Sequence, residues 1–152
     1  MLDGSAMRGE KIYEYELDVT GAQEYGLALS DALSGKTAIP AQGARFDVGF
    51  SGVSKGRLSG RVEGTDFLKM RADGRADLDI RASIENENGD RIALAADGVA
   101  TMRRDEPIAD ILENVSLTTA ASGYDWLLTR QVWAIGTVNF ATGKIFVEAY
   151  LQ

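Results

Sequence analysis

The chain has 152 residues, of which 45% are hydrophobic and 26% are charged, a composition typical of one soluble globular domain. Its net charge of −7 argues against a nucleic-acid partner, because binding to phosphates depends on Lys and Arg. The chain contains no cysteine and no histidine. Disulfides, thiolate nucleophiles, Cys/His zinc sites, Ser-His-Asp triads and haem ligation through these residues are therefore excluded.

Acid–base chemistry in such a chain must use Asp, Glu, Tyr, Lys or bound water, and we expect neither a metal nor a cofactor. No apolar run reaches the roughly 20 residues that cross a bilayer, so we expect no membrane partner. The first residues lack the charged start and apolar stretch of a secretory signal, so we expect a cytoplasmic protein. We interpret residues 1–7 as a cloning-derived or disordered leader before a single domain over residues 8–152.

Residues 10–19 alternate between apolar and polar side chains, which predicts a strand with Tyr13 and Tyr15 on its inward face. Residues 23–33 carry apolar side chains at helical spacing, which predicts a helix that ends at Gly35. Residues 44–50 alternate again and predict the next strand. Glycines then recur at every fourth position: Gly52, Gly56, Gly60 and Gly64. On a strand they would share one face and permit sharp bending or close approach of another backbone, as in a barrel.

The rest of the chain is also dominated by strand patterns. Strands are predicted at residues 66–72, 75–84, 91–101, 115–120, 126–135 and 144–151. The dipeptides Asp73-Gly74, Asn88-Gly89 and Thr142-Gly143 predict turns between them. Residues 107–114 predict a short helix. Roughly nine strands at spacings of about 8–12 residues predict an all-β fold. We expect a closed or nearly closed antiparallel barrel with one or two short helices.

Two charged residues occupy strand faces that are otherwise apolar, where burial costs several kcal/mol unless the charge is paired. Asp66 shares its face with Leu68, Met70 and Ala72. The neighbours of Arg130 on its face are Trp126, Leu128, Val132 and Ala134. One interpretation is a pocket acid and a pocket cation that grips a substrate carboxylate. The other is a structural ion pair, or two groups that reach water at a strand end.

Asp79 and Arg81 share one strand face with polar neighbours, which indicates a solvated outer face. If this face lined the barrel interior instead, the two residues would be the best acid and cation in the protein. Tyr13 and Tyr15 are either core residues with hydrogen-bonded hydroxyls or groups that hold a substrate phenol.

Trp126 and Trp133 point to opposite faces if their strand is regular, so one of them faces outward. Residues 91–101 carry apolar side chains on both faces of the predicted strand. A strand that is apolar on both faces indicates that its outer face is covered by another subunit. We therefore expect a homo-oligomer, with the outward tryptophan marking a subunit contact.

Several short motifs in the second half of the chain resemble those of the domain-of-unknown-function 3237 family. Residues 52–60 resemble its paired-glycine opening, and residues 64–67 resemble its Gly-Ala-Asp-Trp motif with Phe67 in place of Trp. Residues 71–74 and 78–81 are similar to its next two blocks. Residues 124–127 and Gly136 resemble its closing Tyr-x-Trp-Leu block and the glycine after it. The resemblance covers roughly residues 43–150.

The resemblance implies a calycin-like closed barrel that forms oligomers, and it implies little about function. This chain departs from the family pattern at Leu128, where relatives usually have Asn, and it has a longer segment at residues 21–40. If that Asn serves a ligand in relatives, the ligand differs here.

Two classes of function fit the sequence, with a structural protein as a third. The first is a cofactor-free enzyme, a lyase or isomerase (decarboxylase, isomerase or cyclase), acting on a small, largely apolar or aromatic carboxylic acid inside the barrel. This rests on fold-level analogy with metal-free phenolic acid decarboxylases. The second is a non-catalytic barrel that binds a small apolar molecule, and the third is an interaction protein with a filled core.

In the enzyme hypothesis the catalytic groups are Asp66, Tyr13 and Tyr15, with Asp66 moving a proton at a pKa raised by burial. The substrate-binding groups are Arg130, Trp126, Asp79, Arg81 and Trp133. Arg130 clamps the carboxylate, and no metal ligands are expected.

Overall fold

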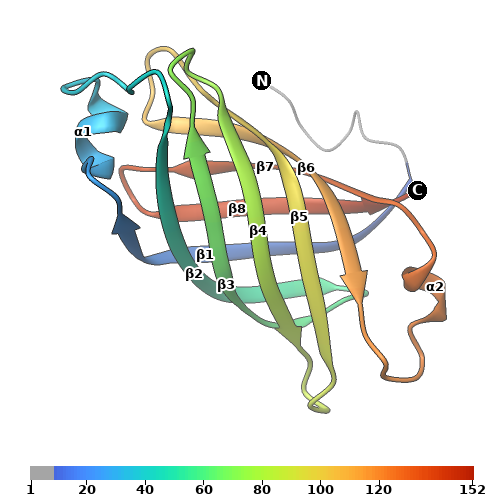
Figure 1. Ribbon diagram of the computed structural model, residues 1–152. Helices are drawn as coiled ribbons and strands as arrows, with labels where there is room; N and C mark the ends of the chain where they lie inside the picture. Colours follow the sequence, from blue (N-terminus) through green and yellow to red (C-terminus); the bar gives the residue numbers. More distant parts are fainter. Residues whose placement is uncertain (1–8) are drawn as a thin grey trace.

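Eight antiparallel strands close into one barrel, as the computed structural model of the protein shows over the described residues, 9–152 (Figure 1). The strands are β1 (Glu10–Glu24), β2 (Ala44–Gly56), β3 (Gly60–Met70), β4 (Ala76–Glu85), β5 (Arg91–Met102), β6 (Ile108–Thr118), β7 (Val132–Asn139) and β8 (Lys144–Leu151). They pair in chain order, and β8 returns to pair with β1. The predicted all-β closed barrel is confirmed. The leader expected at residues 1–7 lies outside the described residues.

The structure has two short helices, α1 (Leu29–Ser34) and α2 (Asp125–Leu128), and the predicted boundaries need correction. The helix predicted to begin at residue 23 begins only at Leu29, because β1 continues to Glu24 and pairs there with β2. It ends where predicted, at Gly35 in the left-handed conformation (φ 77°). The strand predicted at residues 126–135 is wrong in its first half, where α2 and a bend precede β7.

The helix predicted at residues 107–114 is also wrong, because this segment is the first part of β6. Its inward side chains alternate strictly, with Ala109, Ile111 and Glu113 all buried. β6 pairs with β5 on one side and β7 on the other, so barrel closure places this segment between two strands. These long-range hydrogen bonds outweigh the weak local helical spacing.

The four regularly spaced glycines divide between two strands, with the hairpin at residues 57–59 between β2 and β3. A Cβ atom on Gly52 would lie 2.0 Å from the carbonyl oxygen of Glu16, and one on Gly64 would lie 2.3 Å from that of Arg81. Both distances are below any tolerable contact. These glycines therefore permit the close backbone approach that the sequence predicted.

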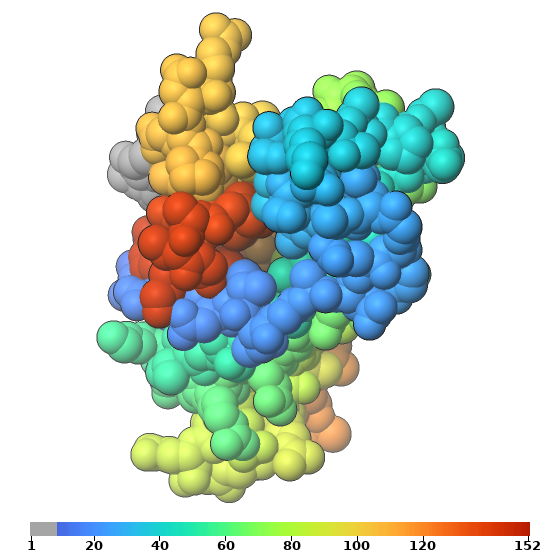
Figure 2. Space-filling model, turned by 90° about the vertical axis from the view of Figure 1, so that its left-hand side faces the viewer, coloured from blue at the N-terminus to red at the C-terminus, as the bar shows by residue number. Residues whose placement is uncertain are grey.

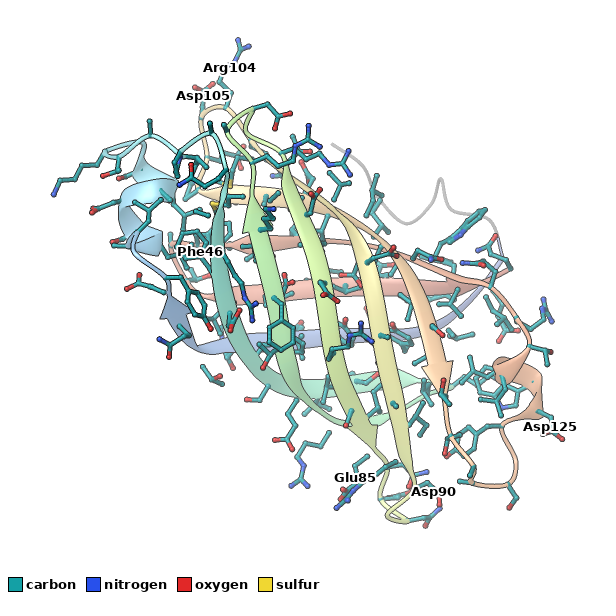
Figure 3. The ribbon with its side chains drawn as sticks, viewed as in Figure 1. Phe46, Glu85, Asp90, Arg104, Asp105 and Asp125 are labelled. Atoms are coloured by element: carbon teal, nitrogen blue, oxygen red, sulfur yellow. The ribbon has the colours of Figure 1, made fainter. Side chains whose placement is uncertain are left out.

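The two ends of the barrel differ in how they are closed. The α2 end comprises the β2–β3 hairpin, the β4–β5 turn and α2. The β4–β5 turn, between Glu85 and Asp90 in Figure 3, is joined to the α2 side because Asn86 Nδ2 donates to the Tyr124 hydroxyl at 2.7 Å. Leu58 and Leu127 are fully buried there, at 2% and 1% exposure. Side chains therefore fill this end.

The α1 end comprises α1, the β3–β4 turn, the β5–β6 loop and the β7–β8 turn. Arg104 and Asp105 lie at the tip of the β5–β6 loop, which projects from the barrel (Figure 3). Figure 2 looks onto this end and shows a depression between the segment that carries α1, in blue to cyan, and the β7–β8 turn, in red. α1 has no buried residue, so it covers this end without plugging it.

Candidate functional site

A cavity of about 250 Å³ occupies the barrel interior toward the α1 end. It exceeds the roughly 150 Å³ of an engineered protein cavity that binds benzene and falls just short of pockets for drug-sized ligands, which start near 300 Å³. Four polar side chains line it: Tyr15, Asp66, Arg71 and Glu113. The remaining lining is apolar or glycine. The space therefore suits one small, largely apolar molecule.

Asp66 points into the cavity from β3, between the inward residues Gly64 and Leu68. The ladder between β3 and β4 pairs Asp66 with Ile80 and then resumes at Lys69. Between these two points of the ladder, the backbone N–H of Asp79 donates to Asp66 Oδ1 at 3.0 Å. Burial raises the pKa of Asp66 to about 6, although the Asp79 N–H acts in the opposite direction by stabilising the carboxylate.

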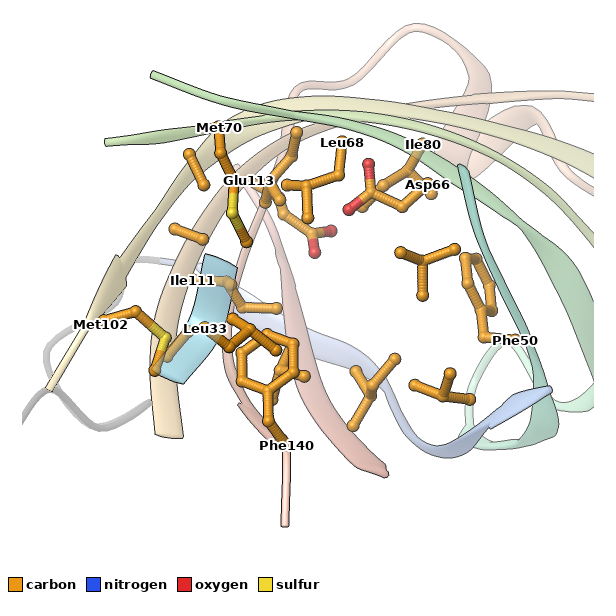
Figure 4. Close-up of a pocket in the computed structure, with 18 of the residues that line it drawn as sticks. Leu33, Phe50, Asp66, Leu68, Met70, Ile80, Met102, Ile111, Glu113 and Phe140 are labelled. Atoms are coloured by element: carbon orange, nitrogen blue, oxygen red, sulfur yellow. The ribbon is translucent and has the colours of Figure 1, made fainter. Parts of the chain in front are cut away.

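Glu113 points into the same cavity from β6 and is only 6% exposed. Its Oε1 atom is buried without a hydrogen-bond partner among the described residues. Burial, and to a lesser degree the charge of Asp66, raise the pKa of Glu113 to about 8. In Figure 4 the carboxyl groups of Asp66 and Glu113 point toward one another and into the cavity. The structure thus joins two carboxyl groups in one apolar space.

Tyr13 and Tyr15 are buried on the inward face of β1, as predicted. Their rings stack with centroids 5.3 Å apart, and Tyr15 lines the cavity. The Tyr13 hydroxyl is buried without a hydrogen-bond partner in the described chain. Burial, and secondarily the charge of Glu113, raise the pKa of both phenols well above the usual value, so both remain neutral near pH 7.

Arg71 is the cation that borders the cavity, at its opening beyond the end of β3. Its Nη2 atom lies 2.5 Å from Asp73 Oδ2, and its side chain is 45% exposed. The guanidinium is therefore already paired and lies at the solvent boundary.

The structure places Arg130 outside the cavity, contrary to the predicted strand face. Arg130 lies in the bend between α2 and β7, where its Nε donates to the carbonyl oxygen of Gln152 at 2.7 Å. Trp126 lies on α2, where the guanidinium of Arg57 sits 3.8 Å from its ring centroid. Both residues belong to the α2 end. The predicted pair of Arg130 with Asp66 does not form.

Asp79 and Arg81 face outward and form an exposed ion pair at 3.5 Å, in line with the solvated outer face. Only the backbone of Asp79 reaches the site. Trp133 also faces outward on β7, is 41% exposed, and borders an outer groove with Leu112 and Val99. A homo-oligomer through this outer face stays a prediction.

Glu113 is the site residue that the sequence reasoning missed. Its face carries Ala109, Ile111, Val115 and Leu117, so the rule that identified Asp66, a lone charge on an apolar strand face, applies to it equally. The helix assigned to residues 107–114 concealed this alternation.

The described residues contain no cluster of three or more acidic side chains arranged to hold a metal ion. Neither described helix has the length and apolar character needed to cross a bilayer. What the cavity does offer is acid–base chemistry: near pH 7, Asp66 can accept a proton while Glu113 and Tyr15 can donate hydrogen bonds.

Three solved structures share this barrel, although their sequences are only distantly similar. A protein with unknown function from Clostridium acetobutylicum ATCC 824 is 17% identical, with a TM-score of 0.76 over 95% of this chain and 99% of that one. A beta-barrel like protein from Acinetobacter baumannii AYE is 19% identical, with a TM-score of 0.73 over 95% and 94%. A conserved protein of unknown function from Rhodopseudomonas palustris is 14% identical, with a TM-score of 0.70 over 96% and 100%. These likenesses establish the fold alone.

No curated protein matches the sequence. The model of a family described as "Protein of unknown function (DUF3237)" matches residues 33–151, which is most of the chain. The resemblance seen in the glycine and Tyr-x-Trp-Leu motifs is thereby confirmed, and the chain belongs to the DUF3237 family.

Proposed function

We propose that the protein is a cofactor-independent enzyme that binds one small, largely apolar molecule in the barrel and moves a proton on it. The observation that carries the proposal is the pair Asp66 and Glu113 in a cavity whose walls are otherwise mainly apolar. Burying two carboxyl groups costs several kcal/mol in folding, and neither is paired with a cation in the cavity wall. Such a cost is typical of sites where the groups act on a ligand.

The environments of the two carboxyl groups separate their protonation states. The pKa of Asp66 is about 6 and that of Glu113 about 8, so near pH 7 the first is mostly ionised and the second mostly protonated. A base and an acid side by side are the requirement for proton transfer without a cofactor. Isomerisation, cyclisation and decarboxylation of an apolar substrate all remain within this class.

A non-catalytic binding barrel is the second candidate, favoured by the predominantly apolar lining. This candidate gives the two carboxyl groups no task beyond fixing the orientation of a ligand. Turnover separates the two candidates, and binding is required by both.

The experiment is a binding series on the indane ring, with indane, 2-indanol, 2-indanone and indane-2-carboxylate as probes, measured by calorimetry. The test variant is Ala100→Leu, which fills the cavity from β5. The matched control is Ala93→Leu, on the outward face of the same strand. We expect at least one probe to bind, with at least tenfold weaker binding in Ala100→Leu and unchanged binding in Ala93→Leu. Failure of every probe to bind, or equal binding in both variants, would contradict the proposal.

A further inference from the structure

Resting on the proposed function, we infer that the substrate is a neutral carbonyl compound with an acidic C–H bond next to the carbonyl group. Asp66 is the base that takes the carbon-bound proton, and Glu113 is the acid that donates a hydrogen bond to the carbonyl oxygen. The two carboxyl groups are alike in chemistry but differ in their contacts, and these contacts assign them different roles.

The hydrogen bonds of the two groups set these roles. Asp66 Oδ1 accepts the Asp79 N–H, a contact that stabilises the carboxylate form and fixes its orientation. Its Oδ2 atom is then the one available to a ligand. Glu113 Oε1 has no donor directed at it among the described residues, which favours the protonated form. A protonated carboxyl group seeks an acceptor, and a bound carbonyl oxygen supplies it.

The charges around the cavity argue against a carboxylate substrate. A carboxylate would lie beside Asp66 with no cation in the wall to offset the repulsion. Arg130, predicted to supply that cation, lies at the α2 end and donates to Gln152. Arg71 borders only the opening and is already paired with Asp73. A neutral carbonyl meets no such repulsion, and its polar atom matches the unpartnered Glu113.

The proton transfer balances without any other reactant. Asp66 Oδ2 takes the proton from the carbon next to the carbonyl group, and the C–H electron pair forms a carbon–carbon double bond. The carbonyl π electrons move onto oxygen, where the hydrogen bond from Glu113 stabilises the developing charge. Protonated Asp66 then returns the proton. Return to the same carbon regenerates the substrate, whereas return to a conjugated carbon isomerises it.

The charge state of the site limits this reaction to a window of pH. The groups that act on the pair are Tyr13 and Tyr15 from β1 and, at the opening, Arg71 with its partner Asp73. The charge of Asp79, on the outer face of β4, also raises the pKa of Asp66. The phenols stay neutral through this range, because burial raises the pKa of both well above the usual value. We expect activity to rise as Asp66 ionises near pH 6 and to fall as Glu113 ionises near pH 8, as apparent values of the coupled pair.

The test is hydrogen–deuterium exchange at the carbons beside the carbonyl group of 2-indanone, followed by NMR in D₂O with the intact protein. We expect exchange above the buffer rate, a bell-shaped pH profile between about 6 and 8, and 2-indanone binding at least tenfold tighter than indane-2-carboxylate. Asp66→Asn, which keeps an acceptor for the Asp79 N–H, should abolish the exchange while retaining binding. Glu113→Leu, which removes the donor, should slow it roughly 10²-fold to 10³-fold, the usual effect of losing one such donor.

The outcomes separate the inference from the proposed function. If 2-indanone binds in the cavity but its protons exchange only at the buffer rate, the inference is overturned and the binding site stands. Tighter binding of indane-2-carboxylate than of 2-indanone would also overturn it. The wild-type pH profile keeps the test valid if a variant fails to fold, because a profile without a limb near pH 6 rejects Asp66 as the base.

Discussion

Ile84 and Ile80 lie on the same inward face of β4, yet one is enclosed by side chains and the other borders the cavity. The same strands thus form the walls of both ends, but side chains fill the interior at the α2 end and leave a cavity at the α1 end. At the α2 end Tyr13 and Leu127 fill the space between the walls. At the α1 end the wall carries small residues at Ala76, Ala100 and Ala109. Strand alternation determines which side chains face inward, and their sizes determine whether a cavity remains.

The sharpest test of this difference is a pair of identical truncations on β4. Ile84→Ala should lower the free energy of unfolding by about 4 kcal/mol, because it opens a new cavity in a filled region. Ile80→Ala should cost about 2 kcal/mol, since part of its side chain already faces empty space. Chemical denaturation measures both. Equal losses would mean that the α1 end is filled in solution.

The second test uses pH. The pKa of Glu113 is about 8 in the folded protein against 4.5 for the free side chain. Below pH 4.5 the group is protonated in both states and contributes nothing. Between pH 4.5 and 8 the unfolded chain loses the proton first, so stability falls as pH rises. Asp66 acts in the same direction, because its raised pKa makes stability fall as pH rises between pH 3.8 and about 6.

We therefore expect the wild-type free energy of unfolding to fall by about 3 kcal/mol between pH 6 and pH 8. Glu113→Gln should remove most of this dependence, because a neutral amide does not titrate. Denaturation curves at several pH values measure the effect. An unchanged slope in Glu113→Gln would show that Glu113 is solvated, as it would be if water entered the α1 end freely.

The third test adds volume to each end. Ala134→Leu, at a position of 1% exposure in the α2 end, should lower the free energy of unfolding by about 2 kcal/mol through overpacking. Ala100→Leu should change it by less than about 1 kcal/mol, because the cavity accommodates the added atoms. Thermal and chemical denaturation of the two variants give the comparison. A larger loss in Ala100→Leu than in Ala134→Leu would reverse the assignment of the two ends.

The smallest expected effect is at Arg130. Its hydrogen bond to the Gln152 carbonyl ties the bend after α2 to the chain end, so Arg130→Leu should cost about 1 kcal/mol. Binding of 2-indanone should not change, because Arg130 does not line the cavity. Calorimetry on the folded variant measures this. Weaker binding in Arg130→Leu would connect the α2 end to the ligand and contradict the separation of the two ends.

The alternation of apolar and polar residues was sufficient to identify Asp66, Tyr13 and Tyr15, which form one half of the site. Asp66 stands out because Leu68 and Met70 continue its alternation without a break, and Tyr13 and Tyr15 follow from the same rule on β1. The turns at Gly74 and Gly89 were confirmed because both adopt positive φ, at 91° and 83°. These features depend on neighbours close in the chain.

The other half required long-range contacts that a sequence pattern does not contain. Glu113 was hidden because Ile108, Ile111 and Leu112 also satisfy helical spacing, and only pairing with β5 and β7 decides for a strand. Arg130 was misplaced because Trp126 and Leu127 form a helical turn that closes the α2 end. In both cases barrel closure overrode a plausible local assignment.

The hydrogen bond from the Asp79 N–H to Asp66 also connects the interior of the barrel to its outer wall. The donor is a backbone amide, whose side chain lies outside in the exposed pair with Arg81. Its proton chemical shift should follow the charge of Asp66 with a midpoint near pH 6. A ligand that removes or shields that charge would move the same resonance. This single amide would thus serve as an intrinsic spectroscopic reporter, giving the occupancy and protonation state of the cavity without any label inside it.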